Sequence, residues 1–216
     1  MEVILELIND RSEEERWNDY FYPGTQTLKN KLNIIDSEEL KSKEAQISFE
    51  KLVQLYENPI FGNYDIQHLK DIHKYIFEDL YDWAGEYRTV NMQKQTGFTD
   101  YRSIDEYLTG ELKLMNEEFL QVDSSYKFAL FLSTYYIQLM AIHPFREGNG
   151  KAAREFLREF VAEKSKDLPF GPLELDWTKF NGEVVLDNIT YALAFRSLID
   201  MEFQKALVNP EEKMKM

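Results

Sequence analysis

The segment His143-Pro-Phe-Arg-Glu-Gly-Asn-Gly-Lys-Ala-Ala-Arg154 collects the residue types that phosphate chemistry needs. His143 can accept a proton, Glu147 can bind a hard metal ion, and two basic residues follow. The glycines lack a Cβ, so the backbone around them can turn tightly and point several N–H groups at one anion. The segment therefore predicts a polyphosphate site with a proton acceptor beside it.

A helix is expected directly after the second glycine. Its apolar residues recur at helical spacing, at Ala153, Phe156, Leu157, Phe160 and Val161. The N-terminus of this helix would direct unpaired N–H groups and a positive dipole end at the glycine turn. Lys151, Arg154 and Arg158 lie at positions i, i+3 and i+7, so they share one face behind that turn.

Composition limits the classes of partner. The chain has 216 residues, of which 44% are hydrophobic, and no linker-like segment divides it, so a single domain over residues 1–216 is expected. The net charge of −14 disfavours nucleic acid and anionic membranes, and a nucleotide would need local cations. The absence of cysteine excludes thiol chemistry and disulfides. An acidic start at residues 1–8 and a longest apolar run of only residues 128–142 favour a cytoplasmic location.

The hydrophobic pattern predicts an all-α fold with one hairpin. Helices are expected over residues 37–56, 65–80, 104–119, 128–142, 151–161 and 176–207. The helix over 128–142 is apolar nearly all round and should be central. Residues 89–98 alternate around a polar turn, which predicts the hairpin, and residues 208–216 are expected to form a flexible tail.

The segment 143–154 closely resembles the signature of the Fic (filamentation induced by cAMP) family, His-x-Phe-x-Asp/Glu-Gly-Asn-Gly-Arg/Lys-x-x-Arg. Lys151 stands where arginine is usual. The likeness covers most of residues 18–165, and residues 82–90 resemble the segment leading into the family's flap. The resemblance implies a helical domain with a small β-hairpin flap over the active site. It also implies transfer of AMP from ATP to a Ser, Thr or Tyr hydroxyl of a target protein, with release of pyrophosphate.

Each signature residue then has an expected role. His143, kept out of a helix by Pro144, would act as the general base, and the alternative is a histidine that caps a helix. Glu147 would bind Mg²⁺, and the alternative is an acid at a helix start. The ATP-binding residues are expected to be Phe145, Gly148, Asn149, Gly150, Lys151 and Arg154.

Within that set, Phe145 is expected to pack and hold the loop rigid. Lys151 would bind the β-phosphate and Arg154 the γ-phosphate, and the alternative is a solvated basic stripe balanced by Glu155 and Glu159. Arg146 is expected to be solvated, and Arg158 is assigned to the solvated stripe. His73 lies on an apolar stripe and is expected in the core.

The flap and the regulation of the site complete the expectations. A target segment would dock along Thr89, Val90, Asn91, Met92 and Gln93. Family members are commonly restrained by a helix carrying Ser/Thr-x-x-x-Glu, and no glutamate in this chain has Ser or Thr four positions earlier. A small antitoxin protein is therefore expected to insert a glutamate near Arg154. The alternatives left open are phosphoryl or phosphocholine transfer, removal of AMP, and a nucleotide-binding module without transfer activity.

Overall fold

The computed structural model describes residues 11–93, 97–181 and 196–210. Its α-helices are α2 (Glu13–Asp19), α3 (Ser37–Glu57), α4 (Ile66–Phe77), α5 (Ile104–Phe119), α6 (Ser125–Ile142), α7 (Asn149–Lys164) and α10 (Arg196–Ala206). Short 3-10 turns are η1 (Tyr101–Ser103), η2 (Ser165–Asp167) and η3 (Trp177–Lys179). The predicted all-α fold is confirmed.

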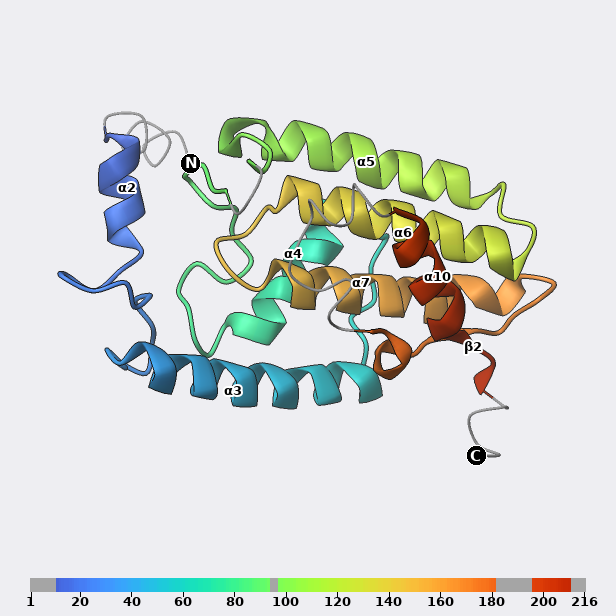
Figure 1. The fold of residues 1–216 in the computed structure, drawn as a ribbon, viewed down its shortest axis with the longest axis horizontal. Coiled ribbons are helices and arrows are strands. Elements are labelled where there is room, and N and C mark those ends of the chain that lie inside the picture. Colours follow the sequence, from blue (N-terminus) through green and yellow to red (C-terminus); the bar gives the residue numbers. More distant parts are fainter. Residues whose placement is uncertain (1–10, 94–96, 182–195, 211–216) are drawn as a thin grey trace.

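The two helices that flank the signature form the centre of the fold. In Figure 1, α6 and α7 lie between α5 on one side and α3 on the other. Helix α6 contacts α5, α7 and α10, while α7 also packs against α4. Side chains from α6 and α7 such as Phe128, Leu132, Phe156 and Phe160 are fully buried. The near-uniform hydrophobicity of α6 is explained because neighbours cover several of its faces.

Side-chain caps start α3, α4 and α6, whereas α7 starts without one. Asp36 accepts hydrogen bonds at the start of α3, Asp65 at the start of α4 and Ser124 at the start of α6. The residue before α7 is Gly148, which has no side chain to accept such a bond. The first N–H groups of α7 are thus left to bind something else.

The C-terminal region differs in part from the helices expected over residues 176–207. Asp176 caps the short turn η3, and α10 supplies the later part of the predicted helix. Strands β1 (Glu174–Leu175) and β2 (Leu207–Val208) pair antiparallel, and such short strands carry no alternation for a sequence pattern to detect. Val208, the first residue of the expected tail over 208–216, instead pairs with Glu174 in this ladder. Residues 182–195 and 211–216 lie outside the described residues.

The flap forms the expected hairpin in a minimal form. Gln93 and Gly97 make one antiparallel bridge, and the Phe98 N–H donates to the Met92 carbonyl at 3.1 Å. The returning strand is tied to α6 by the Thr99 N–H, which donates to the Ala141 carbonyl at 3.2 Å. None of the helices in the described ranges combines the length and the apolarity that crossing a bilayer requires.

Candidate active site

His143 ends α6 and faces the site from a left-handed backbone conformation. Its φ is 51° and its ψ is 61°, and its N–H donates to the Leu139 carbonyl at 3.0 Å. This conformation costs a non-glycine residue about 1–2 kcal/mol. Proline at position 144 disfavours the alternative of continuing the helix. The imidazole is mostly buried and stacks on Phe98 of the flap, with ring centroids 3.8 Å apart.

Arg88 holds the histidine and the flap together. Its Nε donates to the His143 carbonyl at 2.8 Å, and its Nη1 donates to the Val90 carbonyl at 2.7 Å. Its Nη2 donates to the carbonyls of Thr99 and Ile142. Burial lowers the pKa of Arg88 to about 10, so the side chain stays charged at neutral pH. No pattern in the sequence marks this arginine, because only the folded chain brings these carbonyls together.

Asn149 clips the signature loop into shape. Its Oδ1 accepts a hydrogen bond from the Phe145 N–H at 2.8 Å, and its Nδ2 donates to the Phe145 carbonyl at 2.8 Å. The side-chain amide therefore binds its own loop, and it would shape a phosphate cradle rather than reach into it. The Phe145 ring is 1% exposed and packs as expected.

His73 supports the loop from behind. Its Nδ1 accepts the Gly85 N–H at 2.8 Å, so its Nε2 carries the proton and donates to the Glu147 carbonyl at 2.9 Å. Its ring stacks on Phe145 at 3.8 Å. Burial lowers the pKa of His73 to about 4 and keeps it neutral. The expected core histidine is confirmed, and it also fixes the backbone at the candidate metal ligand.

Gly148 can only be glycine in this arrangement. Its φ is +80°, and a Cβ there would lie 2.2 Å from Cε2 of Phe77. The close approach of Phe77 brings α4 directly beneath the turn. The open N-terminus of α7 is therefore held in place by packing.

The predicted site residues converge on one cavity of about 330 Å³. Its lining comprises Met92, Met140, His143, Arg146, Glu147, Gly148, Asn149, Gly150, Lys151 and Arg154. Glu147 is exposed at the cavity, and its Oε1 accepts the Gly148 N–H at 3.0 Å. Phe145, which was also predicted to bind ATP, does not line this cavity but is buried behind its wall.

The two predicted phosphate-binding cations differ in their partners. Lys151 Nζ lies 3.0 Å from Oε1 of Glu44, on α3. The Arg154 guanidinium lies over Gly150, where a Cβ would be 3.1 Å from its Nη1. Within residues 11–93, 97–181 and 196–210, Arg154 forms no ion pair.

Two expectations about arginines were wrong. Arg146 is not solvated but 8% exposed, with its guanidinium carbon 4.8 Å from the ring centroid of Trp17, 5.4 Å from that of Tyr20 and 5.2 Å from that of Phe21. Aromatic faces stabilise a guanidinium, and burial lowers its pKa. Arg158 is likewise not part of a solvated stripe. It pairs with Glu155 at 2.6 Å and donates to the Leu55 carbonyl.

The flap residues divide into two groups. Met92 lines the catalytic cavity and also a neighbouring groove of about 680 Å³, which Asn91 and Gln93 line with it. In contrast, Val90 is fully buried, and the N–H of Thr89 donates to the Tyr20 hydroxyl at 3.2 Å. Only the outer part of the predicted docking segment is thus placed to meet another chain.

Glu147 fits a magnesium ion that a nucleotide brings with it. The described residues contain no group of three or more metal-binding side chains, so a protein-built cage is absent from them. Mg²⁺ commonly takes one or two carboxylates and completes its shell with phosphate oxygens and waters. One exposed carboxylate beside an open helix N-terminus is such an arrangement.

The fold and the cavity define a helical protein that presents a histidine, a carboxylate and a helix N-terminus to one ligand. The chain belongs to the Fic/DOC family, whose pattern matches residues 63–161. It is 32% identical to protein adenylyltransferase VbhT of Bartonella schoenbuchensis over 72% of this chain and 33% of VbhT. It is 31% identical to the probable protein adenylyltransferase y4lH of Sinorhizobium fredii, over 71% of this chain and 80% of that protein.

A solved structure has the same fold. The BepC protein of Bartonella tribocorum, crystallised with bound AMPPNP, superposes with a TM-score of 0.76 at 22% identity. The superposition covers 89% of this chain and 97% of that one. The chain spans 33% of the length of VbhT, so the similarity to VbhT concerns one part of a larger protein.

Proposed function

We propose that this protein is an adenylyltransferase that moves AMP from ATP to a hydroxyl of a target protein. The observation that carries the proposal is the convergence of His143, Glu147 and the open N-terminus of α7 on one cavity. The names of the two adenylyltransferase relatives agree with it. We place the protein in the cytoplasm, where ATP is abundant.

In the proposed reaction, the target oxygen attacks the α-phosphorus of ATP. A new oxygen–phosphorus bond forms, and the bond between the α-phosphorus and the oxygen bridging to the β-phosphate breaks. His143 accepts the hydroxyl proton, and pyrophosphate leaves. Stacking on Phe98 holds the His143 ring for this proton transfer, and the hydrogen bond from Arg88 to the His143 carbonyl holds its backbone.

The charge that develops on phosphate oxygens would be met by the signature loop. N–H groups at the start of α7, with Gly148 and Gly150, would bind the α-phosphate, and the Asn149 clip would keep them pointed at it. Lys151 would bind the β-phosphate and Arg154 the γ-phosphate. Mg²⁺ bound by Glu147 would neutralise the phosphates.

The target would approach along the outer flap. Backbone groups near Gln93 and Gly97 form a short ribbon whose edge can pair with an extended segment. Met92 lines both the docking groove and the catalytic cavity. A hydroxyl carried past Met92 would therefore arrive at His143.

We also propose control by a small antitoxin protein. The chain lacks the Ser/Thr-x-x-x-Glu pattern, and Arg154 has no ion-pair partner among the described residues. A guanidinium that binds a glutamate bidentately cannot also bind the γ-phosphate. Co-expression with a neighbouring gene product should therefore suppress self-modification, and Arg154→Ala should weaken both productive ATP binding and that suppression.

The test uses ATP labelled at either the α- or the γ-phosphate, with cell lysate as the source of targets. Label from the α-position should pass to protein, and label from the γ-position should be released as pyrophosphate. Transfer of the γ-label beyond that seen in lysate without the protein would instead indicate phosphoryl transfer, and binding without transfer of either label would indicate a nucleotide-binding module.

A further inference from the structure

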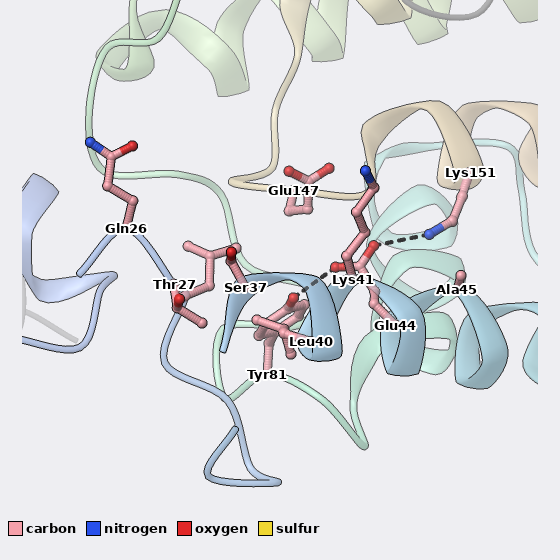
Figure 2. Close-up of a pocket in the computed structure, with 11 residues that line it drawn as sticks. Gln26, Thr27, Ser37, Leu40, Lys41, Glu44, Ala45, Tyr81, Glu147 and Lys151 are labelled. Carbon is pink, nitrogen blue, oxygen red and sulfur yellow. Dashed lines mark hydrogen bonds and ion pairs between the residues drawn. The ribbon is translucent and has the colours of Figure 1, made fainter. Parts of the chain in front are cut away.

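A carboxylate from a distant helix neutralises one of the cations in the candidate phosphate site. Figure 2 shows Glu44 of α3 between Lys151 and Tyr81, with a dashed line to each. Oε1 of Glu44 lies 3.0 Å from Lys151 Nζ, and Oε2 accepts the Tyr81 hydroxyl at 2.7 Å. Both oxygens of this carboxylate are therefore engaged.

The surroundings hold Glu44 in this position. Tyr81 is 1% exposed, and its ring stacks on Trp83 with centroids 4.3 Å apart. Burial and the nearby Glu44 carboxylate raise the pKa of Tyr81, so its hydroxyl keeps its proton and remains a donor. The side chain of Glu44 is only 17% exposed, compared with 27% for Lys151, so solvent screens the pair incompletely. Glu44 cannot turn away from the site without losing this partly buried hydrogen bond.

Lys151 faces two compartments. It lines the catalytic cavity, and with Glu44 and Glu147 it also lines an adjoining cavity of about 500 Å³. A phosphate that approaches Lys151 therefore meets the negative charge of Glu44 at the same point. A lysine ammonium is a compact charge, so a neighbouring carboxylate reduces its attraction for a second anion.

We propose that Glu44 is a specificity-determining residue that weakens the grip of Lys151 on the β-phosphate. The inference rests on the proposed function, because it takes the ligand to be an adenine nucleotide bound at this cavity. Affinity for nucleotides with a β-phosphate is reduced by Glu44, while affinity for AMP is not. Because pyrophosphate carries that same phosphate, Glu44 also promotes its release after transfer.

The test is equilibrium binding of AMP and ADP, by calorimetry, to the full chain. Glu44→Gln keeps the shape and the bond from Tyr81 but removes the charge. It should tighten ADP binding about fivefold, the size expected for one partly screened ion pair, and leave AMP binding unchanged. Glu50→Gln, an exposed carboxylate on the same helix, makes the same change in net charge and should alter neither affinity.

A double variant tests whether Glu44 acts through its ion pair with Lys151 or only through the overall negative charge of the protein. In a Lys151→Gln background, Glu44→Gln should no longer tighten ADP binding. Thermal unfolding checks that each variant is folded, and Glu44→Asp, whose shorter side chain draws the carboxylate back from Lys151, should give a smaller gain of the same sign. An ADP affinity that is unchanged or weaker in folded Glu44→Gln overturns the proposal, as does a gain that persists without Lys151. If wild-type protein binds ADP but transfers no AMP, the proposed function fails while this inference can still hold.

Discussion

The signature loop and the flap face each other across one cavity, yet they are held in opposite ways. The loop is fixed by buried contacts, namely the Asn149 clip, the His73 hydrogen bond and the packing of Phe77 under Gly148. Among the residues that the structure describes, the outer flap has exposed side chains such as Asn91 and Gln93 and one bridge, between Gln93 and Gly97. The difference indicates that the groups for chemistry are preorganised, whereas the edge for recognition is left accessible to a partner.

The largest expected effect is on the chemistry itself. His143→Ala should lower the rate of AMP transfer by about 10²–10⁴-fold, because the hydroxyl proton loses its acceptor. ATP binding should persist, since the phosphate-binding groups remain. Single-turnover transfer and equilibrium binding measure the two separately. Wild-type transfer rates in the variant would show that another group is the base.

A pair of glycine substitutions tests the contrast in packing. Gly148→Ala should destabilise the protein by about 3 kcal/mol, because the new Cβ meets Phe77 and the backbone has a positive φ. Gly97→Ala in the flap is the matched control, since a Cβ there would meet nothing within 4 Å. Urea unfolding gives both free energies. Equal losses in the two variants would contradict a rigid loop and a lightly held flap.

Acid should weaken the loop through His73. The pKa of His73 is lowered by burial to about 4, below its unfolded value near 6.5, so its contribution to stability is present above the unfolded pKa and is lost as pH falls towards 4. Between pH 7 and pH 5 the metal-free protein should lose about 2 kcal/mol from this group. His73→Gln should be less stable at pH 7 but show a smaller loss on acidification. If the stability of the two proteins falls in parallel with pH, His73 does not cause the loss of stability in acid.

The smallest effect is expected at the flap. Met92→Ala should raise the KM for a target protein by about threefold, because the target loses contact with one partly buried apolar side chain. The affinity for ADP should stay unchanged. Steady-state kinetics with varied target and saturating ATP would measure the KM. A fall in kcat with unchanged KM would place Met92 in the chemistry rather than in docking.

The sequence predicted what is local and missed what is brought together by folding. Helical spacing located α4, α5, α6 and α7, and the signature residues are contiguous, so their convergence on one cavity needed little more than a turn and a helix. The prediction that the chain is a Fic protein is confirmed.

The missed contacts join distant segments. Arg146 was expected in water because it is charged, but aromatic residues of an N-terminal segment enclose it. Arg88 binds carbonyls from both the flap and α6, and Glu44 reaches Lys151 from α3. No pattern along the chain marks such pairs, because each depends on how helices far apart in sequence pack together.

The central claim is that His143 and the signature loop transfer AMP to protein hydroxyls. The most direct measurement is mass spectrometry of peptides from lysate treated with ATP–Mg²⁺ and either the wild-type protein or His143→Ala. The account predicts Ser, Thr or Tyr side chains that gain the mass of an AMP group with the wild-type protein and lack it with the variant. Phosphate alone on those side chains, or AMP adducts that are equally abundant with His143→Ala, would contradict it.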